Sequence, residues 1–356
     1  YSLSITEYLT KLISLIAKKR NIKFRSITNT RFGEYILLTD TFGEKVNTEY
    51  NSINHEEPEY SEAKEAIKSF LSQKSLLINA EKKFVKDLEV NPIKYIIFSI
   101  YSATRFLLKT LNQRRTTGIK LPKRNSGFMK IINPSLLQSY LYKFKLIFKL
   151  FKSKITSEVI IKPENYFYLP LAYTIENISA STAGSLLSDF EIINKIRIFA
   201  DPFTNIIVKE HRSMLDQRPN IQKKYLKKLK FNSITYIGDH VSSNKKYSSL
   251  DLILNSKGVI VQSGTTGLEA MLLNKPTLIF GNPIYSQFIP KTIDPENSSE
   301  LFNFFQEPQS YVTSRDYLIN YVSIAIKYGI KLNISEISSG LLSSQKIEEL
   351  AKYLLS

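Results

Sequence analysis

Apolar residues recur along this chain in two spacings, and the balance between them changes at Pro163. Downstream of Pro163, short apolar runs of strand length alternate with stretches in which apolar residues return every three to four positions. The short runs predict strands at YFYLPL, NIIVK, SITYI, GVIVQ and PTLIF, with helices between them. Since such alternation implies right-handed crossovers, we expect a parallel, Rossmann-type sheet within about 170 residues.

Upstream of Pro163 the pattern is mainly helical. Helical spacing is present in SITEYLTKLISLIAKKR, HEEPEYSEAKEAIKSFLSQ and PSLLQSYLYKFKLIFKLFK, whereas KFRSITN and YILLTD have the length and pattern of strands. We therefore predict an α/β protein with a helix-rich N-terminal lobe at 1–163, a Rossmann-like C-terminal lobe at 164–340 and a closing helix at 341–356.

Composition narrows the class of protein. Hydrophobic residues make up 43% of the chain, which is typical of a packed globular fold. No apolar run has membrane-spanning length, and no signal-peptide pattern opens the sequence, so we expect a cytoplasmic protein. Cysteine is absent and there are three histidines, which argues against disulfides and a histidine-rich metal centre. Tyr1 stands where a Met would begin a full chain, which indicates a trimmed sequence.

A net charge of +17 has a partly local origin. Val90–Ser157 contains no Asp or Glu but 14 Lys and Arg residues, interleaved with aromatic and aliphatic ones. Three interpretations stay open for this basic region: a solvated helical face, attachment to an anionic membrane surface on the inner side of the plasma membrane, or binding of a polyanion. An acidic glycan fits the last better than nucleic acid, because no nucleic-acid module is recognisable.

Polar residues gather where the predicted strands end. In an open parallel sheet the ligand binds at the carboxyl ends of the strands. Those ends carry a set of polar and glycine residues: Lys209, His211, Gly238, Asp239, Ser263, Gly264, Thr265, Thr266, Gly267 and Tyr285. A helix that begins in SGTTG presents free backbone N–H groups and a positive dipole end, which suits a phosphate. The alternative is plain N-capping of a buried helix by Thr265 or Thr266.

Two further features fit a nucleotide at this edge. Glu269, in the first turn of the same predicted helix, can accept hydrogen bonds from a ribose; alternatively it is a surface Glu favoured by the helix dipole. Lys209 and His211 alternate along one strand end, so they share a face, with Glu210 on the other. They can bind phosphate and donate to a bridging oxygen, although a lone His is often structural.

Three motifs in order carry a resemblance. The segments YFYLPLAYTIENISASTAG (Tyr166–Gly184), VKEHRSMLDQRP (Val208–Pro219) and SGTTGLEAMLLNKPTLIFGNPIYS (Ser263–Ser286) resemble those of the capsular polysaccharide biosynthesis family, whose better-known members resemble Kdo transferases. The sequence departs from the family at Arg212, which stands where Pro is usual, and at Asn274, where Gly is usual. Arg212 would add a positive charge beside the phosphates.

The resemblance implies a GT-B-like architecture of two Rossmann-like lobes facing a cleft, and glycosyl transfer from a CMP- or UDP-linked sugar to a surface polysaccharide or glycolipid. No DxD-type pair is evident, so we expect no metal and no cofactor beyond the donor. His211 is a candidate for the catalytic machinery, and candidates for the catalytic base are Glu34, Asp40 and Glu176. Tyr285 would cover the donor sugar; alternatively it belongs to a simple turn after a strand.

Two other functions stay open. A sugar-nucleotide 2-epimerase shares the two-lobed architecture, but it needs several carboxylates in one cleft, and the N-terminal half is poor in acid. A non-catalytic scaffold that binds polysaccharide or membrane would use the basic region instead. A scaffold should respond to none of CMP, UDP and GDP.

Overall fold

The computed structural model describes part of the chain, and all structural statements concern that part. The described residues are 13, 15–17, 19–22, 24–41, 45–46, 53–73, 165–172, 189–211, 225–226, 233–237, 248–288, 297–332 and 343–355. The chain divides into two compact units, of which Tyr1–Asn79 with Ile160–Ser356 is the first and Ala80–Val159 the second. The described residues lie in the first unit. The predicted basic region, Val90–Ser157, lies outside them.

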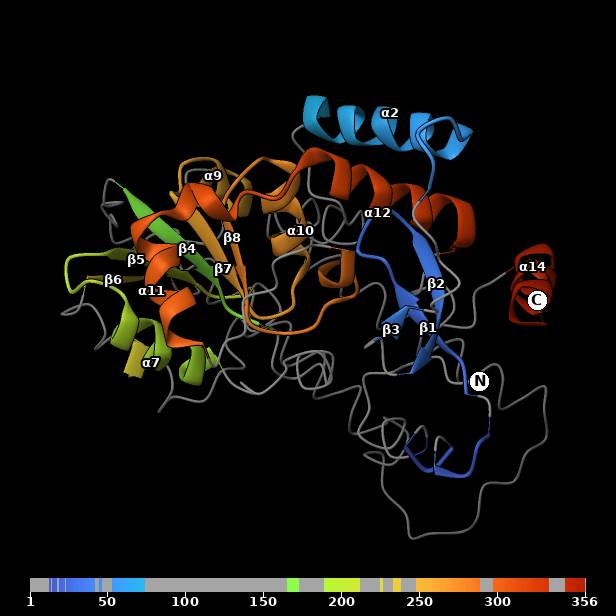
Figure 1. Ribbon diagram of the computed structural model, residues 1–356, viewed down its shortest axis with the longest axis horizontal. Helices are drawn as coiled ribbons and strands as arrows, with labels where there is room; N and C mark the ends of the chain where they lie inside the picture. The colour runs from blue at the N-terminus through green and yellow to red at the C-terminus, as the bar shows by residue number, and fades with distance from the viewer. Residues whose placement is uncertain are drawn as a thin grey trace, which may run out of the picture. The chain divides into compact units, whose positions relative to one another are not determined.

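A five-stranded parallel sheet forms the centre of the described unit (Figure 1). Its strands are β4 (Tyr166–Pro170), β5 (Asn205–Lys209), β6 (Ile234–Ile237), β7 (Gly258–Val261) and β8 (Thr277–Ile279). The order across the sheet is β6-β5-β4-β7-β8, and all four pairings are parallel. Counted from β4 this is 3-2-1-4-5, the order of a doubly wound nucleotide-binding sheet. The predicted Rossmann-type sheet is therefore confirmed.

The strands read as continuous apolar runs because both faces of the sheet are buried. Alternation along β4 sends Tyr166 and Tyr168 into one apolar core and Phe167 and Leu169 into another. The helices α7 (Asp189–Phe199) and α11 (Ser298–Gln306) pack in the second core, with the 3₁₀ turn η6 (Pro308–Tyr311) beside them.

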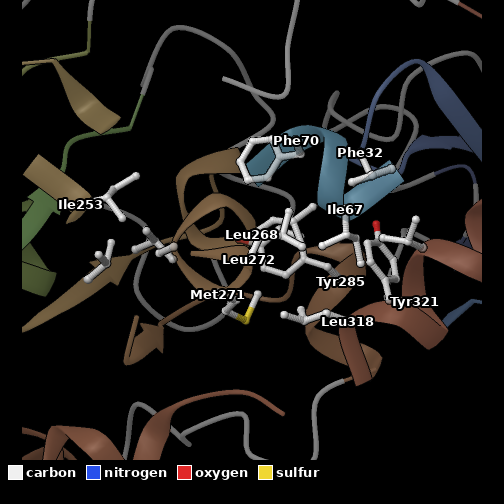
Figure 2. Packing of buried hydrophobic residues seen from close by; sticks show 14 of the residues in the cluster. Phe32, Ile67, Phe70, Ile253, Leu268, Met271, Leu272, Tyr285, Leu318 and Tyr321 are labelled. Carbon is white, nitrogen blue, oxygen red and sulfur yellow. The ribbon is translucent and has the colours of Figure 1, made fainter. Parts of the chain in front are cut away.

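The opposite face carries the helices that matter for the site. These are α9 (Ser249–Leu254) and α10 (Thr265–Leu272), which bury Leu252, Leu268 and Leu272 in the first core. The 3₁₀ turn η5 (Ile284–Phe288) and the helix α12 (Arg315–Tyr328) close the same core (Figure 2). The helix α2 (Pro58–Gln73) lies along α12 and adds Ile67 and Phe70.

The N-terminal strands form a second, antiparallel sheet. Strands β1 (Ser26–Asn29), β2 (Tyr35–Thr41) and β3 (Lys45–Val46) pair in that order, and β9 (Ile330–Lys331) pairs with β2 from the far end of the chain. Helix α14 (Ser344–Leu355) packs on this sheet through Leu350, and Leu38 N–H donates to the Tyr353 hydroxyl. The described N-terminal strands are thus not the parallel sheet of a second Rossmann-like lobe, and the two-lobed GT-B-like arrangement stays a prediction.

The predicted elements are confirmed wherever they fall on described residues, from β1 to β8 and again at α14. Strands β3 and β9 and helices α11 and α12 were not predicted. Contacts between α2 and α12, and pairing of β2 with β9, join segments on both sides of the predicted boundary at Pro163. No helix in the described ranges is both long and apolar enough to cross a membrane.

Candidate functional site

The order of the strands reverses at β4, and this reversal determines where a ligand is expected to bind. From β4 the chain goes to β5 on one side, whereas β7 pairs on the other side of β4 and leads to β8. Ligands of doubly wound sheets bind at this switch point, outside the carboxyl ends of the strands. Three residues separate the end of β7 from the start of α10, so the N-terminus of this helix lies at the switch point. Because β4 lies between β5 and β7, the strand that ends in Lys209 is not adjacent to the strand that leads into α10.

The start of α10 has no side-chain cap. Its N-cap is Gly264, with φ −76° and ψ 166°, and no side chain accepts from the first amides. Thr265 and Thr266 are the first two helical residues and are half-buried, whereas Gly264 is exposed. The predicted alternative, capping by one of these threonines, is therefore wrong. Uncapped amides at an accessible helix start carry a partial positive charge that favours an oxyanion.

Tyr285 supports this helix start from inside the core. Its hydroxyl donates to the Gly264 carbonyl over 2.6 Å, and the side chain is 1% exposed. Burial raises the pKa of Tyr285 well above its usual value, so the phenol stays a neutral donor. A Cβ on Gly267 would come within 2.5 Å of the same hydroxyl oxygen, which explains the glycine there. Tyr285 thus lies beneath the helix start. The prediction that it covers the donor sugar is wrong, because its side chain is buried in the core.

Lys209 lies on the α9 and α10 side of the sheet. Its ammonium donates to the Ser249 hydroxyl over 3.2 Å, and the Tyr168 hydroxyl donates to the same oxygen over 3.3 Å. Lys209 is 4% exposed, so its charge is held inside the protein at the start of α9. The amine is on the predicted face of the sheet.

Glu210 points to the other face, as alternation predicts. It is 1% exposed, and its carboxylate accepts from the Tyr236 hydroxyl and the His211 backbone N–H, each over 3.0 Å. Tyr236 packs against the second core. These bonds fix the backbone just after β5, where His211 is half-buried at the strand tip.

Glu269 is buried within α10. It is 4% exposed, which excludes the alternative of a solvated surface Glu. Its charge lies close enough to Tyr285 to add to the rise in that residue's pKa. A carboxylate that is buried one turn into the helix can accept hydrogen bonds from a ligand that reaches it from the helix start.

The segment that carries this site matches a known protein family. Residues 153–317 match the family described as capsule polysaccharide biosynthesis protein. The resemblance predicted from three motifs is thereby confirmed. No curated protein matches the chain significantly.

The solved structures that align with the chain include two of Thermosulfurimonas dismutans KpsC. Its beta Kdo 2,7 transferase aligns at 16% identity over 56% of this chain and 55% of that one, with a TM-score of 0.32. Its beta Kdo 2,4 transferase aligns at 12% identity over 88% and 75%, with a TM-score of 0.41. This chain thus spans about half the length of the first of these.

The structure does not describe every predicted site residue. Glu176, Arg212, Gly238 and Asp239 lie outside the described residues, as does the side chain of Asp40. Their predicted roles stay predictions. Glu34 is described: it is half-buried in the turn before β2, where its carbonyl accepts from Leu332 N–H over 2.8 Å.

Sequence reasoning missed two residues near the site. Asp189, at the start of α7, accepts from Ala172 N–H over 3.0 Å and so tethers the chain just after β4. In the sequence, Asp189 is marked only as an acidic residue in the first turn of a predicted helix. Ser249, which accepts from Lys209, is one of two consecutive serines that have no distinctive pattern.

Proposed function

We propose that this protein is a glycosyltransferase of capsule polysaccharide synthesis that takes its sugar from a nucleotide-activated donor. One observation carries the proposal: the capsule-family segment places an uncapped helix start, α10, at the switch point of a doubly wound sheet. The donor is CMP- or UDP-linked, and the acceptor is a growing polysaccharide or a glycolipid. The two aligned structures of KpsC are named as Kdo transferases.

The chemistry asked of this site is charge stabilisation. In glycosyl transfer the bond between the anomeric carbon and the phosphate oxygen breaks, and an acceptor oxygen bonds to that carbon. Negative charge grows on the leaving phosphate, and the uncapped amides of Thr265 and Thr266 would stabilise it. His211, at the tip of β5, would donate to the same phosphate.

The remaining assignments concern ligand orientation and proton transfer. Glu269 would accept from the ribose hydroxyls. The acceptor hydroxyl must lose a proton to a base, for which Glu34, Asp40 and Glu176 are the candidates. Attachment of the basic region to an anionic membrane, and a cytoplasmic location on its inner face, complete the proposal.

Binding of nucleotides to His211 and Glu269 variants tests the proposal. Calorimetric titration of the wild-type protein with CMP, UDP and GDP should give binding of at least one. H211A and E269Q should weaken it by about tenfold or more, because a hydrogen bond to a charged group contributes about 1.5–3 kcal/mol. H55A is the matched control, since His55 is exposed and stacks edge-on against Tyr60 before α2.

The outcomes separate the candidate functions. Equal affinity in wild type, H211A and E269Q, with unchanged melting temperatures, would show that the nucleotide does not bind at the proposed site. A protein that binds none of the three nucleotides would instead be the non-catalytic scaffold. An epimerase would bind a sugar nucleotide and change its sugar without an acceptor.

A further inference from the structure

The Ser249 hydroxyl connects α9 to two strands of the parallel sheet. Ser249 is the first residue of α9, and its oxygen accepts from the Lys209 ammonium of β5 over 3.2 Å and from the Tyr168 hydroxyl of β4 over 3.3 Å. Lys209 is the last residue of β5, so this contact lies at the carboxyl end of that strand. Ligands of doubly wound sheets bind at this edge.

The same contact includes the strand at which the strand order reverses. Tyr168 comes from β4, which pairs with β5 on one side and with β7 on the other. Helix α10, which follows β7, contacts α9 and is buried in the same core. The Ser249 hydroxyl and the start of α10 therefore share one face of the sheet, with Ser249 on the β4–β5 side of the switch point and α10 on the β7 side.

The hydrogen bonds at Ser249 leave its own hydrogen to be donated. A serine hydroxyl has two acceptor lone pairs and one hydrogen. Lys209 and Tyr168 occupy the two lone pairs, and no described residue accepts the hydrogen. Ser249 is half-buried, so part of the residue is accessible to a ligand. The hydroxyl is thus a donor that a ligand oxygen can use.

The buried charge of Lys209 strengthens this donor. Lys209 is 4% exposed and Tyr168 is 0% exposed, so the hydroxyl of Ser249 is the accessible member of the three groups. A hydrogen bond from a cation polarises the hydroxyl that accepts it, and successive hydrogen bonds strengthen one another. The polarised O–H therefore favours an anionic oxygen over a neutral one.

We propose that Ser249 is a phosphate-binding residue of the donor site, whose hydroxyl donates to a phosphate oxygen and transmits the effect of the Lys209 charge. The inference rests on the proposed function, in that the phosphate is taken to be the donor's. It changes the part of Lys209, whose ammonium acts through Ser249 and not by direct contact with the ligand. Lys209 and Tyr168 are then positioning residues, which hold the Ser249 oxygen and direct its hydrogen outward.

The neighbouring serine supplies a matched control. The Ser248 hydroxyl caps α9 by accepting from the Asp251 N–H over 3.0 Å, so it belongs to the same helix start but not to the Lys209 contact. In calorimetric titrations with inorganic pyrophosphate, CMP and UDP, S249A should bind about tenfold or more weakly than wild type. S248A should lower the melting temperature and leave these affinities unchanged. Cytidine and uridine, which lack phosphate, should bind S249A and wild type equally.

A double-mutant cycle tests whether Lys209 acts through Ser249. K209M removes the buried charge and should weaken pyrophosphate binding in a protein that has Ser249. In the S249A background, K209M should cause a clearly smaller further loss, because the hydroxyl that transmits the charge is gone. S249T, which keeps a hydroxyl, should bind pyrophosphate more tightly than S249A.

Each contrary result has a separate meaning. Equal pyrophosphate affinity in S249A and S248A would overturn the inference, as would additive losses from S249A and K209M or absence of pyrophosphate binding by the wild type. Equal loss of nucleoside and pyrophosphate binding in S249A would make Ser249 a structural residue. Nucleotide binding that H211A weakens and S249A does not would retain the proposed function and reject Ser249. Pyrophosphate binding that depends on Ser249, in a protein that binds no nucleotide, would retain Ser249 and reject the proposed donor.

Discussion

Gly267 has no room for a side chain, because the Tyr285 hydroxyl lies against it. A Cβ on Gly267 would lie 2.5 Å from the Tyr285 hydroxyl oxygen and 2.8 Å from Val261 Cγ2. Neither neighbour can move easily, because the hydroxyl is bonded to the Gly264 carbonyl and Val261 is buried in the sheet. The absence of a side chain at 267 is therefore what lets α10 start this close to the phenol.

We predict that G267A lowers the free energy of unfolding by about 1–3 kcal/mol through overpacking. The gain in helix propensity from Gly to Ala, about 1 kcal/mol, is too small to offset the upper part of that range. Urea unfolding followed by circular dichroism measures the difference. In a Y285F background the cost of G267A should shrink, because the closest atom is gone.

G264A is the matched control for this prediction. The same methyl group at Gly264 would meet its nearest atom at 4.0 Å, and φ there is −76°, so the chain has room for it. G264A should cost clearly less stability than G267A. Equal costs at the two positions, or additive effects of G267A and Y285F, would show that the Tyr285 contact does not explain the glycine.

Two helices from opposite ends of the chain pack against each other at the scale of elements. Helix α2 turns Tyr60, Ala63, Ile67 and Phe70 inward, at the three- to four-residue spacing of a helical stripe, toward α12. The pattern of α2 alone predicted the helix correctly. The pattern could not predict which helix α2 packs against. Helix α12 begins more than 240 residues later, and its apolar stripe could equally pack against many other elements.

An ion pair joins the ends of the same two helices. The Lys327 ammonium donates to the Glu57 carboxylate, which also accepts from Asn54 N–H. The hydrogen bond from Lys327 is the main reason that the pKa of Glu57 lies below its usual value, and the same bond raises the pKa of Lys327. The pair thus stabilises the fold above the ordinary pKa of Glu, about 4.3, and below that of Lys, about 10.4.

The stabilisation should disappear as pH falls through the lowered pKa of Glu57. We expect E57Q to melt slightly below wild type at pH 7, and the two melting curves to meet below about pH 4. The effect is small because the pair is solvent-accessible. E65Q, which alters an exposed 3.6 Å pair with Lys68 on α2, is the control. A gap between E57Q and wild type that persists unchanged at pH 3 would contradict this assignment.

At the scale of the whole chain, local sequence predicted the parallel sheet but not its order. Apolar runs and glycine or proline boundaries locate β4 to β8, because a strand buried on both faces leaves a clear pattern. The pattern does not say that the chain returns to the other side of β4 after β6, so the sequence alone could not tell which strand ends are adjacent. Only the pairing of β4 with β7 establishes the switch point.

The site was predicted in part for the same reason. SGTTG between a strand and a helix identified the start of α10, since glycine and hydroxyl residues have a local signature there. The support of that start by Tyr285 depends on a contact between residues 21 positions apart, and such a contact leaves no local pattern. The direction of the Lys209 and Glu210 side chains followed from alternation alone, and both are confirmed.

Hydrogen exchange measured by mass spectrometry with and without nucleotide tests most directly the claim that a donor phosphate binds at the start of α10. Whichever of CMP, UDP or GDP binds should slow exchange in peptides that cover Ser263–Gly267, because amides that bind phosphate no longer exchange freely. Peptides from the opposite edge of the sheet, around Lys257, should be unaffected. Binding of a nucleotide with unchanged exchange at Ser263–Gly267 would contradict the account.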